Sequence, residues 1–158
     1  MKTIDSIKLA HYIIDELNSK FEDINHLKVQ KLLYYVDSWH LVFTGHKLIS
    51  DDFEAWVHGP VSRKVFLEFK EHSLIYDVIK PFNEKISLEA EGLAKEQIEI
   101  ISDVLEEYGD KTPYHLECLT HDEKPWKEAR GSCVDSEVCT NIMNQETIKT
   151  FYASLLNE

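Results

Sequence analysis

Between Asn25 and Gly45 the apolar side chains recur every three or four positions, and this spacing constrains the fold of the chain more than any other feature. The face that they share carries Val29, Leu32, Leu33, Val36, Trp39, His40 and Phe43. Asn25 can accept a hydrogen bond at the start of a helix, and Gly45 can end one in the left-handed conformation. The pattern predicts one long helix whose broad apolar face lies at the centre of the core.

The same period predicts further helices along most of the chain. It recurs over residues 4–18, 93–108 and 113–121, in a short segment that Lys124-Pro125-Trp126 opens and Gly131 ends, and in a last segment after Asn144. Pro60 is placed to begin another helix, which the stripe of Val65 and Phe69 carries to about His72. Residues 132–143 are polar, so we expect a loop there.

Two segments favour strands instead of helices. Phe53, Ala55 and Val57 alternate with their neighbours, which predicts a short strand over 53–57. Residues 74–82 are rich in β-branched and aromatic side chains, and they could form a second strand that pairs with the first.

Length and composition agree with one folded domain. The chain has 158 residues, of which 43% are hydrophobic and only 5 are Gly and 4 are Pro, and this composition excludes a fibrous or largely disordered chain. We therefore predict a mainly α fold. It is a single compact helical domain over residues 1–158, with about six to seven helices and a short β-hairpin whose strands lie near 53–57 and 74–79.

The charge balance argues against polyanionic partners. Lys and Arg number 17 and Asp and Glu number 29, so the net charge is −12 at pH 7, and most of the excess lies in the second half of the chain. A field of this sign repels nucleic acids and anionic membranes, and it suits a basic protein partner. No apolar run is long enough to span a bilayer and the first residues lack a secretory signal, so we expect a cytoplasmic protein.

The residues that could carry chemistry form no recognisable catalytic or metal-binding motif. Cys118, Cys133 and Cys139 are 15 and 6 positions apart, which matches no common zinc pattern, and their odd number suits a pool of reduced thiols. No glycine-rich phosphate loop is present. We therefore expect no metal, no cofactor and no enzymatic activity.

Two alternatives stay open at this stage. Cys118, His121 and Asp122 could build the site of a metal- or cysteine-dependent hydrolase. The expected helix over 61–72 could also serve a prophage-type DNA-binding regulator, although two glutamates offset its three basic side chains.

Two polar clusters, each with a tryptophan beside charged side chains, occupy residues 54–61 and 120–130. Their candidates for contact with a partner are Trp56, His58, His121, Glu123, Trp126 and Arg130. Trp and Arg dominate many interfaces, but a Trp after proline also anchors a fold, and the charges can cap helix ends. A further candidate set is the acidic outer face of the helix over 93–108, with Glu99, Asp103 and Glu106. That face could attract a basic partner or only be solvated.

Four ordered blocks of the sequence are similar to a known family. They are KVQKLLYY at 28–35 with WHL at 39–41, EAW at 54–56 with GPV at 59–61, VFLEF at 65–69, and a last block of Tyr108-Gly109, Thr120-His121, Glu123, Pro125-Trp126 and Ala129-Arg130. Together they resemble the Panacea domain, the phage-associated antitoxin family also called SocA-like or GepA-like. The chain departs from the family's usual residues at Val29, His58 and Phe66, and the last two lack phenol hydroxyls that are usual there.

The resemblance implies a mainly helical domain that neutralises a protein toxin encoded beside it, by direct binding. It adds a cytosolic protease as a second candidate partner, because the founding antitoxin of the family delivers its toxin to one as an adaptor. Nucleic acid and membranes are not expected as partners. The motifs leave open whether neutralisation works by covering the toxin or by promoting its proteolysis.

Overall fold

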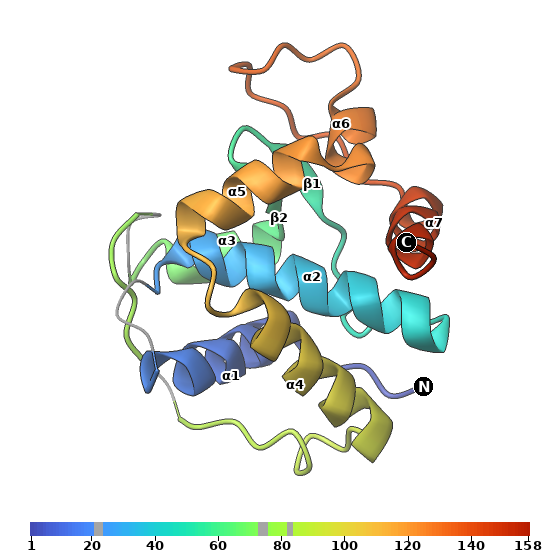
Figure 1. Cartoon of the computed structure of the whole chain (residues 1–158). Coiled ribbons are helices and arrows are strands. Elements are labelled where there is room, and N and C mark those ends of the chain that lie inside the picture. The colour runs from blue at the N-terminus through green and yellow to red at the C-terminus, as the bar shows by residue number, and fades with distance from the viewer. Residues whose placement is uncertain (21–23, 73–75, 82–83) are drawn as a thin grey trace.

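In the computed structural model, helix α2 (His26–Thr44) lies at the centre of the fold, as the apolar spacing predicts (Figure 1). Asn25 Oδ1 accepts a hydrogen bond from the Lys28 N–H at 2.8 Å, and Gly45 ends the helix with a φ of 79°. Other elements cover α2 on several sides, so even charged residues of this helix are buried. Phe43 was predicted to lie on the buried face but is 53% exposed, because the last turn extends beyond the core.

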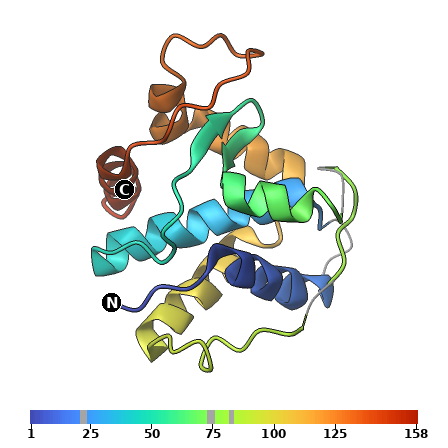
Figure 2. The same ribbon diagram turned by 180° about the vertical axis from the view of Figure 1, so that it is seen from behind.

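Six further helices surround α2 in the described residues, which are 1–20, 24–72, 76–81 and 84–158. They are α1 (Ser6–Asn18), α3 (Arg63–Phe69), α4 (Lys95–Tyr108), α5 (Pro113–Asp122), α6 (Lys124–Arg130) and α7 (Gln145–Leu155). α1 and α4 lie on one side of α2, the β-hairpin and α5 lie on the other, and α7 packs against the C-terminal half of α2 (Figure 1 and Figure 2). The prediction of a mainly α fold with six to seven helices is confirmed.

Several helices begin at caps that the sequence indicates. Thr112 Oγ1 accepts from the His115 N–H at 3.1 Å, with Pro113 in the first turn of α5. Asn144 Oδ1 accepts from the Thr147 N–H at 3.0 Å at the start of α7. Each cap satisfies a backbone donor that the helix itself leaves without a partner.

The β-hairpin joins different segments from those predicted. β1 (Glu54–Trp56) pairs antiparallel with β2 (Gly59–Val61), which follows after a two-residue turn, and does not pair with 76–79, the part of the predicted partner strand that the structure describes. Pro60 was predicted to begin a helix but lies inside β2. Both placements suit proline, since it can stand in an edge strand or in the first turn of a helix. The cap of α3 is Ser62, whose Oγ accepts from the Val65 N–H at 3.2 Å.

The described part of the segment predicted as the second strand, residues 76–81, contacts the two residues just before α2 and does not pair with β1. Residues 74, 75 and 82 of that prediction lie outside the described residues. In the part that the structure describes, Val78 forms an isolated antiparallel bridge with Asn25, and the Ile79 N–H donates to the Ile24 carbonyl at 2.8 Å.

Aromatic packing joins α2 to α4 in the core. The rings of Tyr35 and Tyr108 stack with 4.2 Å between their centroids, and the Trp39 indole N–H donates to the Tyr108 hydroxyl at 3.0 Å. Both contacts bury large apolar surfaces between the helices. Within the described residues, no helix has the length and hydrophobicity needed to cross a membrane.

Candidate functional site

Two polar side chains inside α2 hold the hairpin against the core. Gln30 Oε1 accepts from the Ser62 N–H at 2.9 Å, and Lys31 Nζ donates to the Pro60 carbonyl at 2.8 Å. Burial disfavours the charged form of Lys31 and lowers its pKa to about 7. Gly59 lies against this lysine, since a Cβ at position 59 would be 2.5 Å from Lys31 Cε, and its φ of 107° excludes other residues as well.

A buried carboxyl group joins three helices at the start of α6. Glu123 Oε1 accepts hydrogen bonds from the hydroxyls of Tyr35 on α2, at 2.8 Å, and Tyr152 on α7, at 2.7 Å. Burial raises the pKa of Glu123 to about 7, although the two hydroxyls act in the opposite direction. The hydrogen-bonding capacity of this candidate residue is therefore used within the fold, and below about pH 7 its carboxyl group is uncharged.

Replacing Glu123 with glutamine is expected to remove a pH-dependent part of the stability. The folded protein keeps this carboxyl protonated up to about pH 7, whereas the unfolded chain loses the proton near 4.5. The stabilisation is thus fully present below pH 4.5 and is lost as the pH rises through about 7, by an amount on the order of 3 kcal/mol. Urea unfolding of both proteins across this range should show Glu123→Gln gaining stability relative to wild type as the pH rises.

The exposed Glu71 supplies the matched control for this experiment, because Glu71→Gln makes the same substitution at the surface and Glu71 is not among the charges that shift the pKa of Glu123. The other titrating groups are common to all three proteins, so their contributions cancel in the differences. A difference between Glu123→Gln and wild type that does not change with pH would show that Glu123 is ionised in the folded state.

Trp126 and Arg130 on α6 are also buried, with exposed fractions of 6% and 3%. The Trp126 indole N–H donates to the Trp56 carbonyl at 2.9 Å, and its ring stacks on His121 with 4.1 Å between centroids. The guanidinium of Arg130 donates to four backbone carbonyls, those of Ala55, Val134, Asp135 and Glu137. The two side chains thus fasten β1 and the loop after α6 to the helical core.

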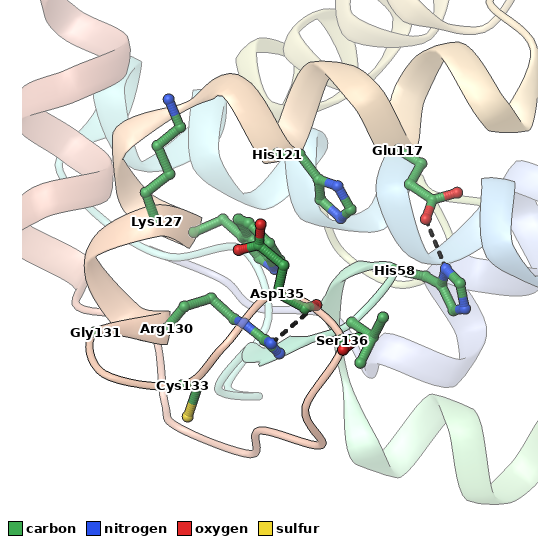
Figure 3. Close-up of a pocket in the computed structure, with 11 residues that line it drawn as sticks. His58, Glu117, His121, Lys127, Arg130, Gly131, Cys133, Asp135 and Ser136 are labelled. Carbon is green, nitrogen blue, oxygen red and sulfur yellow. Dashed lines mark hydrogen bonds and ion pairs between the residues drawn. The ribbon is translucent and has the colours of Figure 1, made fainter.

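A cleft of about 590 Å³ lies between the hairpin turn, α5, α6 and the loop after α6 (Figure 3). His58, at the hairpin turn, places its Nδ1 2.6 Å from Glu117 Oε1 on α5 and its Nε2 2.8 Å from the Tyr76 hydroxyl. His121 points from α5 toward the same space (Figure 3). Burial lowers the pKa of His121, and the Glu117 carboxylate partly opposes this effect. The cleft is therefore lined by both acidic and basic side chains and by aromatic rings.

The structure divides the predicted site residues instead of bringing them all together. Glu123 is buried beside Tyr35 and Tyr152, whereas His58, His121, Trp126 and Arg130 all line the cleft, the last two with largely buried side chains. Trp56 is half-buried, and the Arg63 guanidinium lies 5.5 Å from the centre of its ring. The acidic set of Glu99, Asp103 and Glu106 is exposed on α4, across α2 from the hairpin (Figure 1 and Figure 2).

Glu117 and Tyr76 were missed in the sequence, although both contact His58. Glu117 lies one helical turn before His121, so helical spacing places the two on one face of α5 and could have drawn attention to it. Tyr76 lies 18 positions after His58, and no local pattern joins a turn to so distant a residue.

The structure also bears on the two alternatives that the sequence leaves open. The basic side chains that begin α3 are used in ion pairs, Arg63 with Glu54 at 2.7 Å and Lys64 with Asp5. Little positive charge is left there for phosphate groups. Among the described residues, no three His, Cys, Asp or Glu side chains are grouped as ligands of a metal ion would be.

Comparison with known proteins identifies a family. The model of the family "Antitoxin SocA-like, Panacea domain" matches residues 29–127. The chain is also 29% identical over 85 residues to Antitoxin SocA of Caulobacter vibrioides (strain NA1000 / CB15N), a match that covers 54% of this chain and 45% of that protein. No solved structure is significantly similar to the chain. The family model matches more than half of the chain, from most of α2 through the hairpin, α3, α4 and α5 to the start of α6, so the chain belongs to the SocA-like antitoxin family and contains its Panacea domain.

Proposed function

We propose that this chain is an antitoxin that neutralises a protein toxin by binding it directly, without enzymatic activity, in the cytoplasm. The observation that carries the proposal is that two family blocks distant in sequence pack against each other beside one cleft, with Trp126 donating to the Trp56 carbonyl and Arg130 to the Ala55 carbonyl. The EAW and GPV block forms the hairpin, and the block from Thr120 to Arg130 forms the end of α5 and all of α6. The relative of this chain bears the name of an antitoxin, which supports the same role.

The groups that face outward at the cleft are the proposed contacts with the toxin. All four of His58, Glu117, Trp126 and Arg130 line it, and His58 has the most exposed side chain, at 43%. Binding at a preformed cleft costs little conformational entropy, because Trp126 and Arg130 already hold its walls. A polar rim around aromatic rings is also the usual composition of an interface between two proteins.

Co-expression with the product of the adjacent reading frame tests the proposal directly. Growth should be inhibited by that product alone and restored when this chain is made with it, and the two proteins should copurify. Unchanged toxin levels during rescue indicate that the chain covers the toxin. Levels that fall only when the chain is present indicate delivery to a protease. Failure of rescue together with failure to copurify would contradict direct binding.

The acidic face of α4 is proposed to speed the encounter with a basic toxin. Neutralising Glu99, Asp103 and Glu106 together, as Glu99→Gln, Asp103→Asn and Glu106→Gln, should lower the association rate constant about tenfold at low salt. The difference should vanish at high salt, because dissolved ions screen exposed charges over about 10 Å at 0.1 M. Stopped-flow or surface-based binding kinetics at several salt concentrations measure it.

Three exposed acidic residues elsewhere provide a control with the same change in net charge. The control protein carries Asp52→Asn, Glu71→Gln and Glu146→Gln. If it slows association as much as the α4 variant does, net charge and not the α4 face is responsible. A rate that is equal in wild type and the α4 variant at every salt concentration would exclude steering by this face.

A further inference from the structure

Two cysteine side chains meet in the loop that follows α6. Cys133 Sγ and Cys139 Sγ are 2.7 Å apart, although both are free thiols in the structure. This separation is well inside the distance at which two unbonded sulfur atoms normally rest, and it exceeds the length of a disulfide bond by only about 0.7 Å. The third cysteine, Cys118, lies on α5.

The backbone on both sides of the pair is anchored, so the approach of the two sulfur atoms is set by the fold. On one side Arg130 donates to the carbonyls of Val134 and Glu137, inside the segment that the cysteines bracket. On the other side the Ala55 N–H donates to the Asn141 carbonyl at 2.9 Å, which ties the returning chain to β1. Closing a bond between sulfur atoms held in this way needs little movement of the loop.

We infer that Cys133 and Cys139 are an oxidation site, at which a hydroperoxide converts the two thiols into an intramolecular disulfide. Cys133 is half-buried and Cys139 is 4% exposed, so the hydroperoxide reaches Cys133 first. The Cys133 thiolate attacks one peroxide oxygen, the O–O bond breaks, and a sulfenic acid forms while water or an alcohol leaves.

The second step closes the disulfide and balances the reaction. The Cys139 sulfur attacks the Cys133 sulfur, the S–O bond breaks, and the oxygen leaves as water with the proton from Cys139. The two sulfur atoms together lose two electrons, and the hydroperoxide takes them up. A dithiol reductant reverses the change by thiol–disulfide exchange.

A disulfide would restrict the motion of the segment 133–139, whose residues line two surface hollows. Cys133, Asp135 and Ser136 line the cleft already described, whereas Val138 and Cys139 line a second hollow of about 450 Å³ beside Trp56. A covalent bond between 133 and 139 removes freedom from this segment. The modification is a property of this loop and does not depend on which partner the protein binds.

Mass spectrometry of tryptic peptides from the full chain tests the inference, because trypsin places the proposed pair and Cys118 in different peptides. Cys133 and Cys139 lie in one peptide, 131–149, which contains no internal Lys or Arg, and Cys118 lies in another. The reduced protein is treated with hydrogen peroxide, alkylated with a maleimide and digested. The hydrogen bond with Cys139 raises the pKa of Cys133, so the oxidation is run at mildly alkaline pH to supply thiolate.

We expect peptide 131–149 to escape alkylation and to lose the mass of two hydrogen atoms, while Cys118 is alkylated in full. Treatment with dithiothreitol before alkylation should restore two maleimide groups on that peptide. The Cys118→Ser protein should behave like wild type, and Cys139→Ser should leave Cys133 as a sulfenic or more highly oxidised acid. Full alkylation of both cysteines after peroxide, or disulfides that join Cys118 or a second chain instead, would overturn the inference.

Discussion

Replacing Trp126 with alanine is expected to lower the free energy of unfolding by about 3–5 kcal/mol, the range for truncating a large aromatic side chain in a core. Trp126 is 6% exposed and packs beneath the hairpin, with its ring stacked on His121. The substitution leaves a cavity, and it removes the indole donor that the Trp56 carbonyl uses. Urea unfolding followed by circular dichroism measures the loss.

The exposed Tyr114 on α5 is the matched control, since it is also aromatic but has 74% of its surface in solvent. Tyr114→Ala should change the free energy of unfolding by no more than about 0.5 kcal/mol. If Trp126→Ala instead unfolds like wild type and only toxin neutralisation is lost, Trp126 acts as a contact for the partner and not as an anchor of the fold.

Replacing Arg130 with methionine should cost about 3 kcal/mol of stability and loosen the loop after α6. The methionine retains much of the apolar stem, but it leaves four backbone carbonyls without the guanidinium that binds them. Lysine should not rescue the loss, because a single ammonium group cannot reach carbonyls on several sides as the planar guanidinium does. Unfolding in urea reports the stability, and the rate of cleavage after Glu137 by a glutamate-specific protease reports the loop.

Lys127 on the same helix provides the comparison, because it is exposed. Lys127→Met removes the same charge and should leave both the stability and the cleavage rate close to those of wild type. Equal effects of the two substitutions would mean that the charge of α6 matters and the carbonyl contacts do not.

The sequence alone predicted most of the helices, because helix formation depends on contacts between near neighbours, although α3 begins after Pro60 and not at it. The span from Asn25 to Gly45, the cap at Thr112 with Pro113, and the cap at Asn144 are all present as expected. Helical periodicity and capping act over three or four residues, so they can be recognised along the chain. The family blocks were recognisable for the related reason that they are short and ordered.

The sequence did not settle which strands pair or which polar side chains are buried. β1 pairs with β2, and in the described residues not with 76–79, and Lys31 and Gln30 from a different element hold β2 in place. Alternation along one strand describes that strand and carries no information about its partner.

The same limit applies to the site. In the sequence, Glu123 and Arg130 look like charged residues of the surface. In the structure, Glu123 accepts hydrogen bonds from tyrosine hydroxyls of two other helices. Arg130 donates to backbone carbonyls of β1 and of the loop after α6. Whether a charge is solvated or buried depends on partners that are distant in the chain and meet only in the folded state. The sequence by itself determined the helices and the family, whereas the hairpin, the cleft and the buried polar contacts were decided by tertiary packing.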